Sequence, residues 1–326
     1  MRRREFMQLV AGTAAGWPFT AHAQQRPKWR VGVLGPSGLS PVIAQIMAAF
    51  SDGIGQGGLR DVAEIEIVAR FADNQLDRLP ALAQELVEQG VQAIWAGAPA
   101  AVGAARRATS AIPIVAMDLE TDPVADGWAT SLAHPGSNVT GVFLDLPGFS
   151  AKTLQLLREA VPDLSKVAVF WLPASGPRQL EAARSAASIL NLTLEVFEVG
   201  RPSEFEAAFQ AAAKSKASGV LMLSSPLFSA SPQALADLAL ANRLPAISIF
   251  PNFSQKGGLM AYGPDLLELS VQAGVMTRKL LQGASAADLP IERPTRFKLV
   301  ANLKTASALG VTLPTSILLS ADEVIE

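Results

Sequence analysis

The chain has 326 residues, a length that predicts two domains because one domain usually takes ~100–200 residues; 49% of the residues are apolar and 17% are charged. Its 27 basic and 29 acidic residues give a formal net charge of −2, which argues against a nucleic-acid-binding protein because such proteins carry a basic surplus. Cysteine is absent and only two histidines occur, so thiol nucleophiles, disulfides, iron–sulfur clusters and histidine-rich metal sites are excluded, and we expect no metal or cofactor.

The first 23 residues have the pattern of an export signal. Arginines 2–4 precede an apolar stretch over residues 9–19, and Ala21-His22-Ala23 forms a small-x-small cleavage site. The apolar stretch is shorter than the ~20 residues that are needed to cross a bilayer. Arg3-Arg4 followed by Phe6-Met7 indicates the twin-arginine route, and an ordinary secretion signal is the alternative.

Export would change the charge of the protein and decide its location. Cleavage after Ala23 removes three arginines and one glutamate, which leaves 24 basic and 28 acidic residues and a net charge of −4. A lipoprotein anchor requires a cysteine, and later apolar runs are interrupted by glycine, proline or charge. We therefore expect a soluble periplasmic protein without a lipid anchor.

Short β-rich runs alternate with helical patterns between residues 30 and 143, which is typical of a parallel sheet flanked by helices. Strands are predicted at residues 30–34, 64–71, 91–95, 112–117 and 138–143. Helices are predicted at residues 41–50, 77–89 and 98–109. The middle helix has leucines at 79, 82 and 86 and ends before Gly90, and Pro99 lies in the first turn of the last one.

A second series of the same kind follows. Helices are predicted at residues 151–160, 179–190, 203–214 and 232–242, and strands at 166–171, 192–199, 219–223, 246–250 and 258–262. A long helix over 266–281, a strand over 296–300 and a helix over 304–309 complete the chain. Two α/β units in tandem leave a cleft between them, and ligands of such sheets bind beyond the carboxyl ends of the strands. The loops that follow the strands are therefore the candidate site.

Two turns of the first unit are candidates for ligand contact. Gly35-Pro36-Ser37-Gly38 lacks both the three-glycine dinucleotide pattern and the P-loop lysine, so we interpret it as a turn that brings Pro36 and the Ser37 hydroxyl to the cleft. Ala98 and Pro99 open a helix whose first N–H groups favour an anion such as a carboxylate. Plain helix initiation by proline is the alternative.

An acidic loop follows the fourth predicted strand. It contains Asp118, Glu120, Asp122 and Asp126, which could receive an ammonium group or line a polar wall. Glycoside hydrolysis, a hard-cation site and a merely solvated loop are alternatives. We select Asp118 and Asp122, with Asp122-Pro123 as the preferred pair for the cleft.

Hydroxyl and aromatic side chains follow strands of the second unit. Ser224, Ser225, Phe228, Phe250 and Tyr262 combine aromatic faces with hydroxyls, which suits a small organic ligand, although Phe250 and the nearby Phe253 could be core residues. His134 lies in a turn, and no hydrolase motif such as Gly-x-Ser-x-Gly accompanies it. We therefore expect no catalytic residue and no enzyme.

An ordered set of short motifs resembles the periplasmic substrate-binding proteins of ABC-type importers, in the branch that includes tryptophan- and tyrosine-binding members. The matching stretches are 31–36 (VGVLGP), 77–80 (DRLP), 112–115 (IPIV), 121–124 (TDPV), 135–141 (PGSNVTG), 257–265 (GGLMAYGPD), 287–290 (ADLP), 302–306 (NLKTA) and 321–326 (ADEVIE). Each stretch is weakly specific by itself, whereas their order and spacing across about 290 residues are strongly specific.

The resemblance implies the type I periplasmic-binding fold, in which two Rossmann-like lobes close around a ligand. Lobe 1 would comprise residues 30–144 and 263–291, and lobe 2 residues 145–262 and 292–326. Three hinge crossings would lie near 144–148, 262–264 and 290–294. Hinge closure around a small polar, amino-acid-like or aromatic solute would then let a monomeric receptor deliver it to an ABC permease in the inner membrane.

The alternatives to a transport receptor are a sensor subunit for a membrane receptor kinase, a cofactor-bearing enzyme and a sugar-responsive repressor. The repressor is disfavoured because an export signal stands where a DNA-binding helix pair would be. Two departures from the family also matter. Many relatives have threonine where Ala98 stands, and the Ser224-Ser225 loop lacks the Asp or Asn that is common in amino-acid-binding relatives. We therefore do not assign tryptophan as the ligand.

Overall fold

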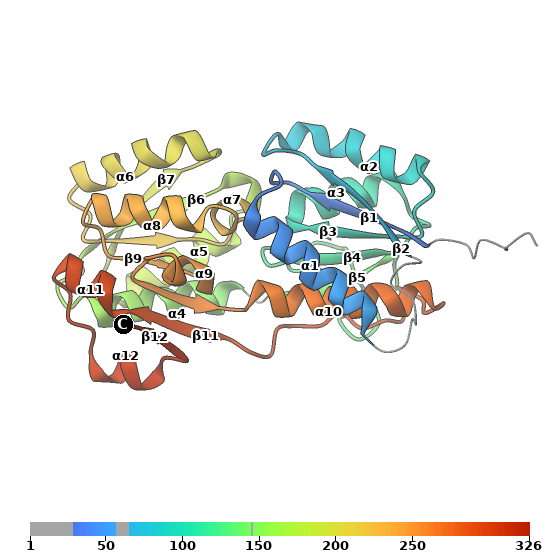
Figure 1. The fold of residues 1–326 in the computed structure, drawn as a ribbon. Helices are drawn as coiled ribbons and strands as arrows, with labels where there is room; N and C mark the ends of the chain where they lie inside the picture. The colour runs from blue at the N-terminus through green and yellow to red at the C-terminus, as the bar shows by residue number, and fades with distance from the viewer. Residues whose placement is uncertain (1–28, 57–64, 145) are drawn as a thin grey trace, which may run out of the picture.

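The computed structural model describes residues 29–56, 65–144 and 146–326, which form two α/β lobes lying side by side (Figure 1). The predicted export signal lies outside the described residues. Among the residues that are described, no helix combines the length and apolar character needed to cross a membrane. The two sheets agree with the predicted α/β class.

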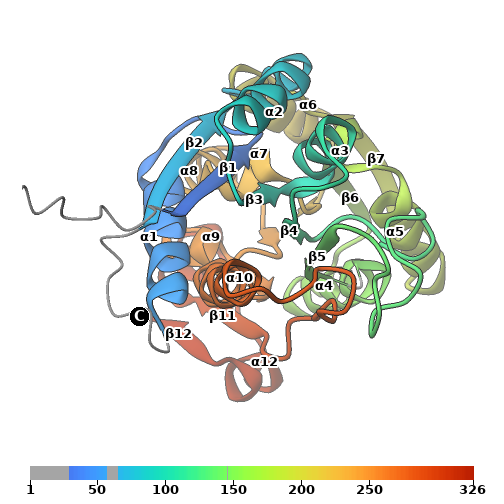
Figure 2. The ribbon, with the colours of Figure 1, turned by 90° about the vertical axis from the view of Figure 1, so that its right-hand side faces the viewer.

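The first lobe is built on a five-stranded parallel sheet in the order β2-β1-β3-β4-β5. Its strands are β1 (Trp29–Gly35), β2 (Ile65–Phe71), β3 (Ala93–Gly97), β4 (Ile114–Asp118) and β5 (Val139–Phe143). Because side chains alternate along a strand, the sheet buries apolar residues on both faces. Helices α2 (Leu79–Glu88) and α3 (Ala98–Ala108) cover one face, and α1 (Pro41–Gly55) and α10 (Leu266–Leu281) cover the other (Figure 2).

Helices α1 and α10 approach each other closely through two glycines. A Cβ atom added to Gly53 would lie 2.1 Å from the Val271 carbonyl oxygen, and one added to Gly274 would lie 2.2 Å from the Phe50 carbonyl oxygen. Only a residue without a side chain fits at such distances. This contact fixes α10, which follows the second lobe's strand β10 (Met260–Gly263) in the chain, against the first lobe.

The second lobe is built on a seven-stranded sheet in the order β12-β11-β10-β9-β8-β6-β7, in which only β10 and β11 pair antiparallel. Its strands are β6 (Lys166–Trp171), β7 (Thr193–Glu198), β8 (Gly219–Met222), β9 (Ala246–Ser248), β10 (Met260–Gly263), β11 (Lys298–Asn302) and β12 (Glu323–Ile325). Its longer helices are α4 (Leu146–Ala160), α5 (Arg178–Ile189), α6 (Phe205–Lys214) and α8 (Pro232–Ala241). Two buried clusters, one on each face, form its core.

Several short elements were not predicted from the sequence. Helices α7 (Pro226–Ser229) and α9 (Pro251–Gln255) stand where loops were expected, each with proline at its first position, and α12 (Thr315–Ser320) and β12 lie in the expected tail. Such elements are too short to show a 3.6-residue apolar period. Helix α1 also runs five residues beyond the predicted end at residue 50, to Gly55.

The chain passes between the lobes three times: after β5, after β10, and between α10 and β11. The last segment runs along the first lobe before it leaves. The Glu292 N–H donates to the Gly141 carbonyl at 2.9 Å, and Phe143 N–H donates to the Glu292 carbonyl at 3.0 Å. The Thr140 hydroxyl donates to the Leu289 carbonyl at 2.8 Å. The third crossing is therefore anchored on the edge strand of the first sheet.

Candidate functional site

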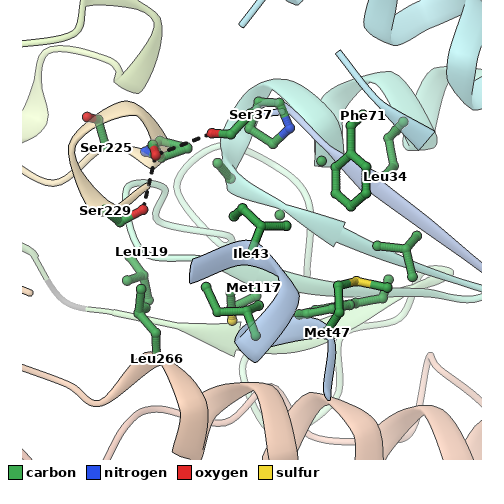
Figure 3. Close-up of a pocket in the computed structure, with 18 of the residues that line it drawn as sticks. Leu34, Ser37, Ile43, Met47, Phe71, Met117, Leu119, Ser225, Ser229 and Leu266 are labelled. Carbon is green, nitrogen blue, oxygen red and sulfur yellow. Dashed lines mark hydrogen bonds between the residues drawn. The ribbon is translucent and has the colours of Figure 1, made fainter. Parts of the chain in front are cut away.

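A cavity of about 90 Å³, called here the central cavity, lies between the lobes at the carboxyl ends of β1, β3 and β4 (Figure 3). Four of its lining residues come from the second lobe, namely Ser225, Pro226, Ser229 and Phe250. The remaining residues come from the first lobe and from α10: Val33, Leu34, Gly35, Pro36, Ser37, Ile43, Ile46, Met47, Phe71, Trp95, Gly97, Ala98, Met117, Leu119, Glu120 and Leu266.

The first lobe gives this cavity an apolar wall. Ile43 and Met47 project from the first turns of α1, Phe71 ends β2, and Met117 lies near the end of β4 (Figure 3). Ser40 starts α1 because its side chain accepts a hydrogen bond from the Ile43 N–H at 3.3 Å. The cap therefore fixes where the helix begins and which of its side chains face the cavity.

Trp95 lies between this cavity and the core of the first lobe. Its ring stacks on Phe50 at a centroid distance of 4.1 Å and an interplanar angle of 10°. The indole is 4% exposed, and its Nε1 donor has no hydrogen-bond partner within the described part of the chain. An unmatched buried donor costs free energy, so a ligand acceptor near Trp95 would be favourable.

The second lobe contributes the short helix α7. Ser225 caps it by accepting a hydrogen bond from the Phe228 N–H at 3.2 Å. The Pro226 carbonyl accepts hydrogen bonds from the Ser229 hydroxyl at 3.1 Å and, across the lobes, from the Ser37 hydroxyl at 3.3 Å (Figure 3). Ser37 and Ser229, which share the Pro226 carbonyl as acceptor, therefore close one end of the cavity with atoms of both lobes.

A second contact between the lobes is buried. The Glu120 Oε1 atom lies 2.5 Å from the Ser224 hydroxyl. Gln179 of α5 fixes the Ser224 backbone, because its amide accepts from the Ser224 N–H at 2.6 Å and donates to the Ser224 carbonyl at 3.0 Å. Glu120 is 6% exposed and lines the cavity, so one carboxyl group both contacts the cavity and joins the two lobes.

Glu120 and Asp118 form a buried acid pair. Burial raises the pKa of Glu120 to about 8, the Asp118 charge adds to the rise, and the hydrogen bond from Ser224 opposes it. Burial also raises the pKa of Asp118, to about 6, while hydrogen bonds from residues 120 and 121 hold it down. Glu120 is therefore mainly protonated at neutral pH, because water is not available to solvate its charge.

The cleft continues into a smaller pocket of about 30 Å³ beside Pro99 and the 3₁₀ turn Pro173–Ser175. Ala98, which lines both spaces, has a φ of 65°. This left-handed conformation is unfavourable for a residue with a Cβ, and such strain is found at ligand clamps. At the rim, an ion pair of 2.7 Å joins Arg178 of the second lobe to Asp126 of the first.

The structure brings part of the predicted site together. Pro36, Ser37, Ala98, Ser225 and Phe250 line the central cavity, and Pro99 lines the smaller pocket. Asp118 and Ser224 are fully buried and lie behind Glu120, to which both are hydrogen-bonded.

Three predicted residues lie elsewhere. Asp122 is exposed and accepts hydrogen bonds from the Val124 and Ala125 N–H groups, so it caps its own turn. Phe228 is 2% exposed and packs in the core behind α7. Tyr262 stacks on Phe149 at 5.7 Å and lines a separate pocket of about 150 Å³. Sequence patterns predict the loop or strand in which each of these residues lies, but they do not predict the direction of its side chain.

Sequence reasoning missed most of the apolar wall: Ile43, Met47, Phe71, Trp95, Met117 and Leu266. The sequence feature that could have identified these residues is their position at strand ends or in the first turns of helices that point at the cleft. The acidic-loop prediction includes Glu120 but favours Asp118 and Asp122 for the cleft. Within the described ranges, no group of three or more His, Asp or Glu side chains could hold a metal ion.

Comparisons with known proteins agree with this architecture. The chain is 25% identical over 275 residues to a tyrosine-binding protein of Clostridioides difficile, covering 83% of this chain and 78% of that protein. A Streptococcus pneumoniae domain solved in complex with L-Trp superposes with a TM-score of 0.81 at 24% identity, covering 91% of this chain and 100% of that one. A ligand-free, open substrate-binding protein of Clostridium difficile gives a TM-score of 0.62 at 22% identity, covering 91% and 99%.

The L-Trp complex and the open protein share the type I periplasmic-binding architecture that the motifs predicted, and the same arrangement of two lobes is present here. The sequence model described as ABC transporter substrate binding protein matches residues 39–325, nearly the whole chain. This makes the chain a solute-binding receptor rather than an enzyme, because such a protein binds its solute reversibly. The chain belongs to the ABC transporter substrate binding protein family.

Proposed function

We propose that this chain captures a small aromatic or amino-acid-like solute in the central cavity and presents it to an ABC permease. One observation carries the proposal: an apolar cavity lined by both lobes, with Glu120–Ser224 and Ser37–Pro226 hydrogen bonds that cross between them. A solute held between the lobes would favour the closed arrangement, because a ligand stabilises the state that binds it more tightly.

The arrangement of the lobes supports closure as the working motion. At similar identity and coverage, the chain superposes better on the domain solved with L-Trp, at a TM-score of 0.81, than on the ligand-free, open protein, at 0.62. The direct contacts between the lobes, Glu120 with Ser224 and Arg178 with Asp126, also indicate that the lobes are closed on each other. We therefore assign this arrangement to the closed state, and an open state would separate these pairs.

The site of action that we propose is the periplasm, with the inner-membrane permease as the partner and the receptor acting as a monomer. The support is the basic and apolar pattern of residues 2–23 together with membership of a transporter family. We retain the twin-arginine route as part of the proposal because of Arg3-Arg4. The sensor alternative gains nothing from the family match, which is to transporter components.

Native mass spectrometry of the full chain, purified without denaturation, tests the proposal. We expect one small molecule bound per chain. A thermal-shift screen of amino acids, aromatic acids, amines, short carboxylates and sugars then identifies the class of solute that stabilises the fold. A solute present at 100 times its Kd should stabilise the fold by about 2.7 kcal/mol. A bare chain that no solute in the screen stabilises would contradict the proposal, as would a stoichiometric redox cofactor.

A further inference from the structure

The charge lining of the central cavity is one-sided. Glu120 is its only ionisable lining residue, and no lysine, arginine or histidine of the described chain lines the cavity. The remaining polar side chains are Ser37, Ser225, Ser229 and the Trp95 indole. A solute whose only charge is negative would therefore meet a carboxyl group and no basic side chain.

The acid pair also lacks a basic partner. Asp118 Oδ1 accepts hydrogen bonds from the Glu120 and Thr121 N–H groups at 2.9 and 3.0 Å. Its Oδ2 atom is buried and accepts no hydrogen bond within the described residues. The neighbouring side chains that lower the pKa of Asp118 by hydrogen bonding are those of Thr121 and Glu120, and neither of them is basic. The ion pairs of the described residues include neither Asp118 nor Glu120. The closed site thus holds two carboxyl groups, one proton and one negative charge.

We propose that the solute carries an ammonium group that binds Glu120 in place of this proton, with its apolar body against Phe71, Met47 and Met117. The inference deepens the proposed function and rests on it. No covalent bond changes: Glu120 releases its proton to the solvent, and the ammonium group takes its position. The site carries one net negative charge before and after binding, so the buried charge of the closed state is unchanged.

The groups around Glu120 define the expected pH dependence. Among the described residues, Asp118 at the end of β4 is the one charged group that acts on it, whereas Ser224 beyond β8 and Gln179 of α5 are neutral. The Arg178–Asp126 pair lies at the exposed rim. Because the cation replaces a proton, its affinity should rise with pH until Glu120 is ionised in the free protein. The affinity of an anion would change in the opposite direction.

Isothermal titration calorimetry of the full chain with three matched probes tests the inference. Tryptamine is a cation, L-tryptophan a zwitterion and indole-3-propionate an anion, and all share the indole body. We expect the Kd of tryptamine to fall by at least about tenfold between pH 6 and pH 8, because the cation replaces a proton that the raised pKa of Glu120 retains at pH 6. At pH 7, titrations in two buffers of different ionisation enthalpy should show the release of close to one proton. Indole-3-propionate should bind at least tenfold more weakly than tryptamine.

A conservative variant separates charge from structure. Glu120→Gln keeps an amide that can donate to Asp118 and accept from Ser224, but it has no proton to release. We expect it to fold normally, to lose proton release and pH dependence, and to bind tryptamine at least tenfold more weakly at pH 8. Asp77→Asn makes the same carboxyl-to-amide change at an exposed position of the first lobe and should match the wild type.

Each outcome decides the inference. If L-tryptophan binds more tightly than tryptamine, an amino acid is the source of the ammonium group. If tryptamine binds more tightly, the source is a primary amine. Indole-3-propionate binding as tightly as tryptamine, a pH-independent Kd, or binding without proton release would overturn the inference and leave the cavity as a solute site. Failure of all three probes would also overturn it, whereas the proposed function would fail only if no solute at all bound.

Discussion

The two walls of the central cavity differ in construction. The first-lobe wall consists of sheet ends and of α1, which is held against α10 by the Gly53 and Gly274 approach, and it is largely apolar. The second-lobe wall consists mainly of the four-residue helix α7 and meets the first lobe through hydrogen bonds.

This difference assigns separate tasks to the walls. Burial of apolar surface is non-directional, so the first lobe can hold a solute before closure. Hydrogen bonds depend on distance and angle, so those from Ser37 and Glu120 form only when the second lobe has closed. Affinity should therefore be most sensitive to the first wall, and the open–closed equilibrium to groups that reach the second.

The largest expected effect is that of pH on the open–closed equilibrium of the solute-free protein. The pKa of Glu120 is raised by burial in the closed state, so protonation stabilises closure fully below its ordinary value near 4.5, and this stabilisation is lost as pH rises through about 8. We expect the solute-free protein to open between pH 5 and pH 9, with an increase in radius of gyration by small-angle scattering. Glu120→Gln should remain compact at both values, and an unchanged wild type would refute the assignment.

A larger side chain on the first-lobe wall, filling the central cavity, should have the next largest effect. Ile43→Trp adds a large ring inside the cavity and should weaken solute binding by ~100-fold or more through steric overlap, measured by calorimetry. Ile189→Trp, which places the same ring at an 81% exposed position of the second lobe, is the matched control. If the two variants bind the solute with equal affinity, the solute does not bind in the central cavity.

The rigidity of the first wall can be tested at α10. Gly274→Ala would place a Cβ atom against the Phe50 carbonyl, and overpacking of this kind costs ~1–3 kcal/mol of unfolding free energy. Denaturant unfolding measures the loss. Gly148→Ala in α4 has open space around its Cβ and should not destabilise the protein. Similar values for both variants would show that the close helix approach is not a strong constraint.

The rim ion pair should matter least. Arg178 and Asp126 are 40% and 36% exposed, and exposed pairs contribute ~0.2–1 kcal/mol, less in high salt. Arg178→Ala should therefore weaken solute binding by less than about fivefold in low salt, and the difference should vanish in high salt. A loss that approaches that of Ile43→Trp would mean that the rim, rather than the cavity, controls closure.

The sequence predicted the fold more completely than the site. Alternating strand and helix patterns identified the two α/β units, because each of these elements is long enough to show its period. The turns at Ser37, Ala98 and Ser225 were found because they follow strands that end at the cleft. Asp122 and Tyr262 were misplaced relative to the cavity because side-chain direction there is set by local capping and by aromatic packing.

The apolar wall could not be recognised from sequence alone. Met47 and Phe71 are ordinary core-type residues until the second lobe is positioned opposite them. Glu120 differs from Asp122 and Asp126, the exposed acids of its loop, in being buried, and that burial depends on Ser224, which lies 104 positions away. Contacts between the lobes therefore define the site, and single-sequence patterns do not contain them.

The central claim is that one solute contacts both walls at once. Hydrogen–deuterium exchange of the full chain, with and without its co-purified solute, measures this directly. We predict protection of residues 35–37 and 97–98 in the first lobe together with 225–229 in the second, and no change at 316–320 beside Tyr262. Protection confined to one lobe, or centred on residues 316–320, would contradict the account.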